Sequence, residues 1–131
     1  MTRETVDELI QNGESSHVEF KTQDAHPNSL AEEIVAFANF DGGVMLFGVD
    51  DAGEVVGCAR SDIEDAVMNV CRNTNTVRPA IIPLIEKVRL AEKLILAVTI
   101  TRGETAYSTN RGLYYIRVGS TKQIPTQQEL L

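Results

Sequence analysis

Four acidic residues near two predicted strand ends could together bind a metal ion. Glu14 precedes the first predicted strand, Glu19 lies within it, and Asp50 and Asp51 follow the central strand. Hard divalent ions such as magnesium and manganese prefer oxygen ligands, and carboxylates from neighbouring strands can supply them. Such an ion can activate water and stabilise the charge of a phosphodiester transition state. Because the chain has 19 acids, these residues fit equally well as a solvated loop residue, an exposed strand residue and turn formers.

Basic residues form a second candidate site. Arg117 ends a tyrosine-rich stretch and leads into Gly119-Ser120-Thr121-Lys122, while Lys21 lies on the first predicted strand. Backbone amides and small hydroxyls beside two cations suit contacts with phosphate groups. We therefore predict Lys21, Arg117 and Lys122 as the phosphate contacts of a nucleic-acid-binding surface. A plain turn at residues 119–121 is the simpler alternative.

The composition limits the classes of protein that need consideration. The chain has 131 residues, 43% of them hydrophobic, which suits one compact domain with a core. The formal net charge of -7 argues against a sequence-independent DNA coat protein, so any nucleic-acid surface must be a local basic patch. Neither a membrane-spanning run nor a signal peptide is found, which makes a cytoplasmic location the default. Cys58 and Cys71 lack metal-site spacing and are expected to be buried thiols.

The central stretch of the chain, residues 36–51, positions the acidic pair. Gly42-Gly43 is expected to supply the positive φ that ends one helix and turns the chain tightly. Residues 44–49 are few and uniformly apolar, which indicates a central strand covered on both faces. A turn at residues 50–53 then predicts a second strand returning over 54–58.

The rest of the pattern predicts helices and strands around this centre. Apolar spacing and capping-box pairs, Thr5 with Glu8 and Ser29 with Glu32 among them, place helices at about 5–13, 29–39 and 61–73. Alternation and β-branched residues place strands at 17–22, 84–90, 94–100, 106–108 and 113–118. The fold class is therefore α/β (α+β), with a mixed twisted sheet of about five or six strands, two main helices and a short N-terminal helix. In the last strand, Tyr114 or Tyr115 could stack on a base, although one of them must face the core.

The direction of the first strand decides whether the carboxylates can meet. If the strands at 17–22 and 44–49 are parallel neighbours, Glu14 lies at the opposite end of the sheet from Asp51. The acids converge only if these strands are antiparallel or strongly offset. The sequence leaves both arrangements open, and it also assigns the first strand a charged, half-exposed face that carries Glu19 and Lys21.

The C-terminal residues start a helix that the chain does not complete. Thr126 and Glu129 have capping-box spacing, yet the sequence stops two residues later. We therefore expect residues 1–131 to be a single domain that forms the N-terminal part of a longer protein. A frayed tail is the alternative.

Several motifs, in this order, resemble the Schlafen AlbA-like domain family. They are Glu14-Ser15-x-x-x-Glu19-Phe20-Lys21, Ala36-Phe37-Ala38-Asn39 with Gly42-Gly43, Phe47-Gly48-Val49-Asp50-Asp51, Val55-Val56-Gly57 and Tyr115-Ile116-Arg117-Val118-Gly119-Ser120. The resemblance runs from Glu14 almost to the C-terminus. In bacteria and archaea, such domains stand at the N-terminus of transcriptional regulators, which implies a nucleic-acid-binding, specifically DNA-binding, module.

The same resemblance implies an alternative activity. Some vertebrate Schlafens are similar to endoribonucleases that cut transfer and ribosomal RNA with three carboxylates and a divalent metal. Those acids correspond to Glu14, Glu19 and Asp51 here, which would then be catalytic residues and ligands of Mg or Mn. Schlafen nucleases pair two such modules around RNA, so a homodimer or a partner would have to complete the groove. Their zinc-binding cysteine and histidine cluster has no counterpart in this chain.

Three functions follow from these observations. The first is a nucleic-acid-binding module of a prokaryotic transcriptional regulator, with no certain cofactor and no membrane. The second is a metal-dependent endoribonuclease acting on structured RNA. The third is a protein-interaction or oligomerisation module, which the net charge of -7 keeps open. Asn39, beside the glycine turn, is a further polar candidate for the site, with a helix C-cap as its alternative role.

Overall fold

A computed structural model describes residues 1–125 of the chain, which have a mixed α/β fold. The main sheet has the strand order β1-β2-β5-β4, formed by β1 (Val18–Lys21), β2 (Gly43–Phe47), β4 (Leu84–Leu90) and β5 (Lys93–Ile100). β1 and β2 are parallel, whereas β2 with β5 and β5 with β4 are antiparallel. The predicted fold class is confirmed, including two main helices and a helix near the N-terminus.

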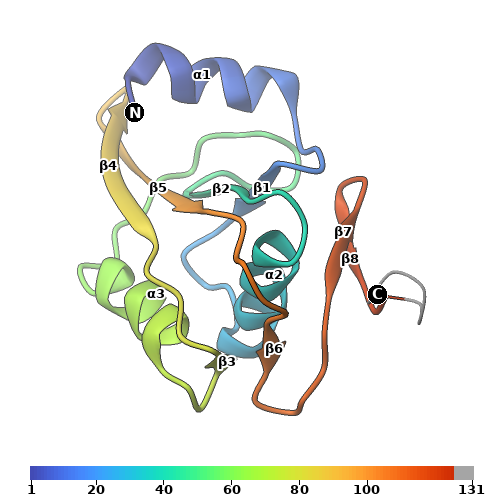
Figure 1. Cartoon of the computed structure of the whole chain (residues 1–131). Helices are drawn as coiled ribbons and strands as arrows, with labels where there is room; N and C mark the ends of the chain where they lie inside the picture. The colour runs from blue at the N-terminus through green and yellow to red at the C-terminus, as the bar shows by residue number, and fades with distance from the viewer. Residues whose placement is uncertain (126–131) are drawn as a thin grey trace.

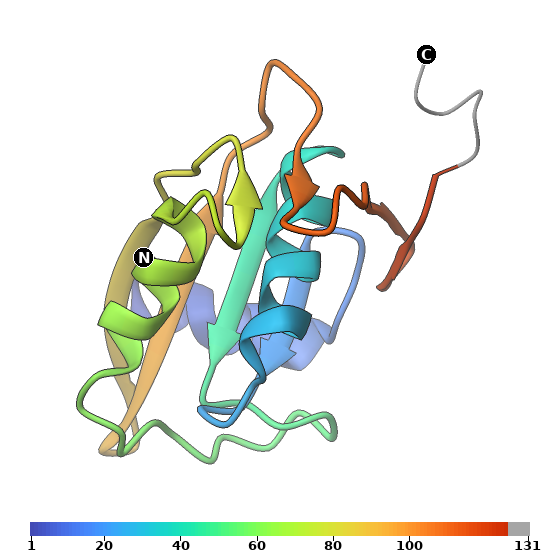
Figure 2. The ribbon, with the colours of Figure 1, turned by 90° about the horizontal axis from the view of Figure 1, so that it is seen from below.

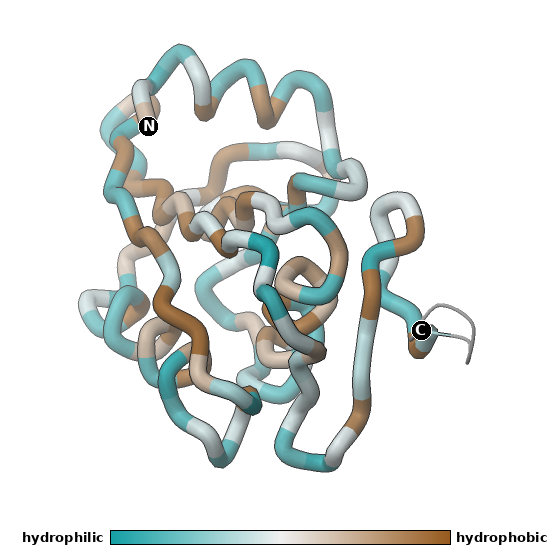
Figure 3. The backbone as a smooth tube through the Cα atoms, in the orientation of Figure 1, coloured by the Kyte–Doolittle hydropathy of each residue, from teal (hydrophilic) through white to brown (hydrophobic). Residues whose placement is uncertain are grey.

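Helices cover both faces of the main sheet (Figure 1). α2 (Pro27–Ala38) and α3 (Ile63–Arg72) cover one face, where Phe37 and Val67 share a buried cluster with Phe47. α1 (Arg3–Asn12) crosses the other face, where Val6 packs in a second buried cluster with Leu46. Figure 3 shows the apolar residues of α1 turned toward the sheet. Because successive strand residues point to opposite faces, one sheet supplies both clusters. No helix within the described residues is long and apolar enough to cross a membrane.

Two short ribbons extend the fold beyond the main sheet. β3 (Val77–Arg78) pairs antiparallel with β6 (Ser108–Thr109), and β7 (Ile116–Val118) pairs antiparallel with β8 (Thr121–Gln123). Figure 2, seen from below, shows β3 and β6 side by side at one end of the molecule. The predicted strands were therefore too long at the C-terminal end, and the main sheet holds four strands rather than five or six. Thr126 and Glu129, which the sequence assigned to a helix start, lie outside the described residues.

The segment predicted as a strand over 54–58 forms only one isolated bridge, between Val49 and Val55. It still follows the sheet, because the N–H groups of Val56 and Gly57 both donate to Gly48 O at 2.8 Å. Cys58 N–H then donates to Leu94 O, also at 2.8 Å. The segment therefore wraps the end of the sheet without becoming a further strand.

α1 and α2 begin earlier than the capping-box pairs predicted. Thr2 caps α1, and its Oγ1 accepts a hydrogen bond from Thr5 N–H at 3.1 Å. His26 caps α2, and its Nδ1 accepts from Asn28 N–H at 3.1 Å. Pro27 then fits the first helical turn, because its fixed φ suits a helix and its missing N–H would have no partner there.

The two glycines between α2 and β2 serve different purposes. Gly42 has a φ of 74° and donates its N–H to Phe37 O at 2.9 Å, as the turn requires. Gly43 does not have positive φ, contrary to the prediction. A Cβ at Gly43 would lie 2.5 Å from Phe37 Cε1 and 2.7 Å from His17 O. Gly43 is therefore needed because α2 and the chain before β1 approach the backbone too closely for a side chain.

Candidate functional site

The guanidinium of Arg117 lies at the centre of a buried group of charges. Its Nη1 is 3.0 Å from Glu19 Oε2 and 2.8 Å from Glu33 Oε2, and its Nη2 donates to Ser15 O at 2.6 Å. The Arg117 side chain has no exposed surface, and its Cζ lies 4.5 Å from the centre of the Phe37 ring. One side chain thus joins β7 to β1, to α2 and to the segment before β1.

β1 and α2 bring the two carboxylates to this guanidinium. Glu19 and Lys21 share one face of β1, since residues two apart in a strand point the same way. The sequence predicted that this face is half exposed, but α2 and the β7–β8 ribbon cover it and leave Glu19 only 9% exposed. Glu33 is buried on the side of α2 that also carries Phe37, four residues along the helix.

Lys21 and Lys122 lie around the same carboxylates. Lys21 Nζ is 3.8 Å from Glu33 Oε1. Lys122 Nζ is 3.0 Å from Glu32 Oε1 and 3.1 Å from Ser29 Oγ. The side chains of Lys21 and Lys122 are 17% and 23% exposed. Both ammonium groups therefore face α2 carboxylates, and only part of each side chain is open to solvent.

Burial beside other carboxylates raises the pKa of Glu19 to about 7. Burial is the largest cause, because it disfavours the charged form, and the negative charge of Glu33 is the next. Glu14 acts in the same direction, whereas the hydrogen bond from Arg117 lowers the pKa. We define the ion network as Glu14, Glu19, Glu32, Glu33, Lys21, Arg117 and Lys122. Its acids outnumber its cations, so its formal charge does not favour an anion.

The structure places Glu14 beside Glu19 but leaves Asp51 in a turn. Glu14 Oε2 accepts the Phe20 N–H at 2.9 Å, which satisfies the free edge of β1. Asp51 follows β2 and is exposed. β1 and β2 are parallel, which is the arrangement for which Glu14 and Asp51 were expected at opposite ends of the sheet. Within residues 1–125, no three His, Cys, Asp or Glu side chains are placed to hold a metal ion. As they stand, Glu14, Glu19 and Asp51 do not fit a divalent ion.

Arg117 could contact phosphate, as the sequence predicts, only after release from both carboxylates. The predicted phosphate contact requires an exposed guanidinium, whereas this one is buried and bonded to Glu19 and Glu33. Glu33 was overlooked in the sequence. Its position three residues after Leu30 and four before Phe37 puts a charge on the apolar stripe of α2, and this was the available signal.

Asn39 is the C-cap residue of α2, which confirms the alternative role that the sequence left open. Its Nδ2 donates to Tyr107 O at 2.8 Å and to Tyr115 O at 2.9 Å. Its Oδ1 accepts the Tyr107 N–H at 2.7 Å. Asn39 therefore attaches the segment leading to β7 to the end of α2, and its polar atoms are occupied by backbone partners.

Comparison with known proteins identifies a family and several solved structures of similar fold. The model of the family described as Schlafen, AlbA_2 matches residues 14–126. One similar structure is the N-terminal domain of a Nitrosomonas europaea protein named as an ATP-dependent DNA helicase RecG-related protein. It is 26% identical with a TM-score of 0.67. That match covers 94% of this chain and 92% of that domain.

The second similar structure is the DIP2311 protein of Corynebacterium diphtheriae. It is 16% identical with a TM-score of 0.68, and the match covers 95% of this chain. At this identity the likeness shows the fold alone. The match covers 26% of the Corynebacterium chain, so this domain spans about a quarter of that protein.

Proposed function

Because the chain belongs to the Schlafen AlbA_2 family, we propose that it is a nucleic-acid-binding module of a larger regulatory protein. The observation that carries the proposal is the 26% identity with the N-terminal domain of a protein named as an ATP-dependent DNA helicase RecG-related protein. The two chains share the fold over 92% of that domain, so the likeness concerns the module itself. A module of this kind would hold nucleic acid for the remainder of its protein.

In such a module the ion network would serve as a scaffold. Glu19, Glu33 and Arg117 hold the β7–β8 ribbon against β1 and α2, because one buried guanidinium bonds to both carboxylates. Lys21 and Lys122 stay candidates for phosphate contacts through the exposed parts of their side chains. Any such contact competes with Glu32 and Glu33, which already bind these ammonium groups.

A metal-dependent endoribonuclease is the second candidate function. It is favoured by the proximity of Glu14 to Glu19, since Glu14 helps to raise the Glu19 pKa and both residues match the Schlafen motif. The exposed position of Asp51 counts against it. A nuclease would need a rearrangement that brings Asp51 to the other two carboxylates.

Fluorescence anisotropy tests the binding function. Labelled single-stranded DNA, duplex DNA and transfer RNA are titrated with the domain at about 50 and about 200 mM salt. We expect binding that weakens as salt rises, because phosphate contacts release counterions. The proposal fails if no nucleic acid binds at low salt, and a protein-interaction module then becomes the better reading.

Incubating the same RNA with manganese and then with EDTA separates the two candidate functions. A binding module leaves the RNA intact in both conditions. Manganese-dependent cleavage that disappears in Glu19→Gln and Asp51→Asn would replace binding by nuclease activity as the function. The Asp7→Asn variant is the matched control, because Asp7 is an exposed acid on α1.

A further inference from the structure

Two long segments of the chain contain no acidic residue, and the fold places them together. Residues 66–85 and 105–128 hold none of the 19 acids. They nevertheless carry five of the 12 cations, namely Arg72, Arg78, Arg111, Arg117 and Lys122. β3 from the first segment pairs with β6 from the second, as Figure 2 shows. The chain has a net charge of -7, yet the two paired segments contribute no carboxylate to this end of the molecule.

Three arginines at this end flank the loop of residues 73–76. Arg72 ends α3 and directly precedes the loop. Arg78 Nε donates to Thr74 O at 2.6 Å, which lays its guanidinium against the loop. Asn110 N–H donates to Thr76 O at 3.1 Å and so brings the neighbouring Arg111 to the other side. We define the arginine patch as Arg72, Arg78 and Arg111.

The charges of the arginine patch are available to a ligand. All three side chains are exposed, and none forms an ion pair with another of the described residues. Some other cations are neutralised, as Arg60 is by Asp62 and Lys87 by Glu64. The remaining cations outside the patch form no ion pair among the described residues either, namely Arg3, Arg89, Lys93 and Arg102. Glu32 is the acid that shares a small cavity with Arg111. Its carboxylate is already bound by Lys122 Nζ and by the Tyr115 hydroxyl.

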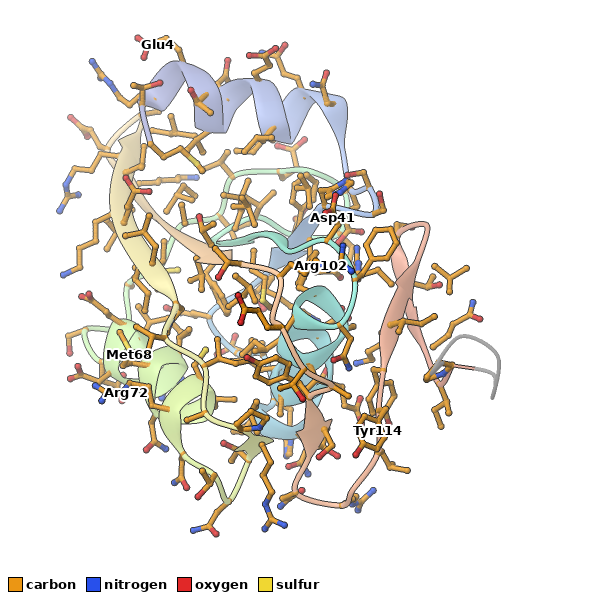
Figure 4. All side chains as sticks on the ribbon, viewed as in Figure 1. Glu4, Asp41, Met68, Arg72, Arg102 and Tyr114 are labelled. Carbon is orange, nitrogen blue, oxygen red and sulfur yellow. The ribbon has the colours of Figure 1, made fainter. Side chains whose placement is uncertain are left out.

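The surroundings of the patch add hydrogen-bonding groups and one aromatic ring. The cavity of about 20 Å³ beside Arg111 is lined by Thr76, Thr109 and Asn110. Thr109 Oγ1 is buried and makes no hydrogen bond within the described residues. Tyr114, three residues after Arg111, is 37% exposed. Figure 4 shows Arg72 at the left and Tyr114 at the right of the lower half of the view, whereas Asp41 and Arg102 lie in the upper half.

From these features we infer that the arginine patch binds the phosphodiester backbone of nucleic acid, an inference that rests on the proposed function. Guanidinium groups suit phosphate because their planar N–H donors match its oxygens and their charge is permanent. Three such groups come from residues that flank the loop of residues 73–76, and they can contact the phosphates of one strand. Tyr114 offers a ring on which an unpaired base can stack. The predicted contacts Lys21 and Lys122 belong to the ion network, which adjoins the patch at Glu32, the acid that lines the same cavity as Arg111.

Charge-neutral variants test the arginine patch against the rest of the surface. The triple variant Arg72→Gln, Arg78→Gln, Arg111→Gln is compared with Arg3→Gln, Arg89→Gln, Arg102→Gln, since all six arginines are exposed. Both triples change the net charge equally. We expect the patch triple to weaken single-stranded DNA binding at least tenfold and to lower the salt slope by roughly two to three. The control triple should weaken binding less than threefold.

Two further measurements keep the outcomes distinct. The triple replacement of the patch by lysine should keep the salt slope, because it retains the three charges, and thermal unfolding should show that each variant folds. If the wild type binds but the two glutamine triples weaken binding equally, the assignment of the contacts to the arginine patch is contradicted. The proposed nucleic-acid binding is still supported in that case. If Lys21→Gln with Lys122→Gln removes binding and the patch triple does not, the contacts lie at the ion network. Absence of binding by the wild type contradicts the function itself.

Discussion

Arg117 Nη1 lies 3.0 Å from Glu19 Oε2, although the two residues are 98 positions apart in the chain. The same nitrogen is 2.8 Å from Glu33 Oε2, so a single side chain bonds to two buried carboxylates from β1 and α2. The β7–β8 ribbon has strands of only three residues each. Its position therefore depends on this buried charge more than on its own backbone pairing.

Removing the guanidinium should destabilise the domain strongly. The Arg117→Met variant leaves Glu19 and Glu33 buried without their shared cation, which we expect to cost about 3–5 kcal/mol of unfolding free energy. Urea denaturation followed by circular dichroism measures this. Arg111→Met is the control, since Arg111 is exposed, and it should change stability by less than about 0.5 kcal/mol. A loss below about 1 kcal/mol in Arg117→Met would contradict the scaffold role.

The raised pKa of Glu19 predicts that its contribution to stability falls as pH rises. Its pKa is about 7 in the folded protein against 4.5 as the ordinary value, so the folded state binds more protons between these two pH values. Unfolding free energy must then decrease across this interval, by up to roughly 3 kcal/mol from this group.

Comparison with Glu19→Gln isolates this effect. The variant keeps an acceptor for Arg117 and removes the titrating group, so the stability of the wild type relative to the variant should fall from about pH 5 to about pH 7.5. Urea unfolding at a series of pH values provides the measurement. A difference that is flat, or that rises with pH, would show that Glu19 is ionised at a normal pKa.

Replacing Asn39 should loosen the segment that leads to β7. Asn39→Ala removes two donors and one acceptor whose partners are backbone atoms of Tyr107 and Tyr115. We expect a loss of about 2–3 kcal/mol, because the partner groups are left without hydrogen bonds. Amide exchange of Tyr107, measured by NMR, should accelerate. Asn75→Ala provides the control at an exposed asparagine, and slow Tyr107 exchange in Asn39→Ala would refute the role.

A methyl group at position 43 should be poorly tolerated. The Cβ of Gly43→Ala would lie 2.5 Å from a Phe37 ring carbon, so α2 or the ring has to move. We expect a cost of about 1–3 kcal/mol, as for other overpacked sites. Gly53→Ala separates this from backbone effects, because Gly53 has a φ of 82° and no atom within 4 Å of its Cβ position. Thermal unfolding of both variants gives the comparison, and an unchanged melting temperature for Gly43→Ala would argue against the close packing.

The two thiols should react slowly in the folded protein. Burial raises the pKa of Cys71 to about 12 from 9.0, and it raises the pKa of Cys58 as well. The thiolate fraction of Cys71 at pH 8 is then roughly a thousandfold below that of a free thiol. Reaction with a chromogenic disulfide, with and without urea, tests this. Labelling of Cys71 at the same rate in both conditions would show that the thiol is accessible.

Local patterns predicted the parts of the fold that depend on neighbours in sequence. The helix, glycine turn and strand around Gly42 were identified because each has a recognisable pattern within a few consecutive residues. The β4–β5 hairpin was identified for the same reason. The network around Arg117 was not, because its carboxylates come from Glu19 and Glu33 and depend on how β1, α2 and β7 pack. Strand lengths near the C-terminus were overestimated, since β-propensity cannot tell whether a paired partner is available.

The acid-free segments also make the charge distribution differ between two ends of the molecule. α1 exposes Glu4, Asp7 and Glu8 on the layer that Figure 1 shows at the top, while β3 and β6 lie at the bottom. The acids of α1 would repel a nucleic acid that diffuses toward the domain, and the arginine patch would attract it. The nucleic acid would therefore be oriented before contact forms. Dissolved ions cancel this guidance beyond about 8 Å at physiological ionic strength. Salt should therefore slow the association of nucleic acid with the domain as well as weaken the equilibrium binding.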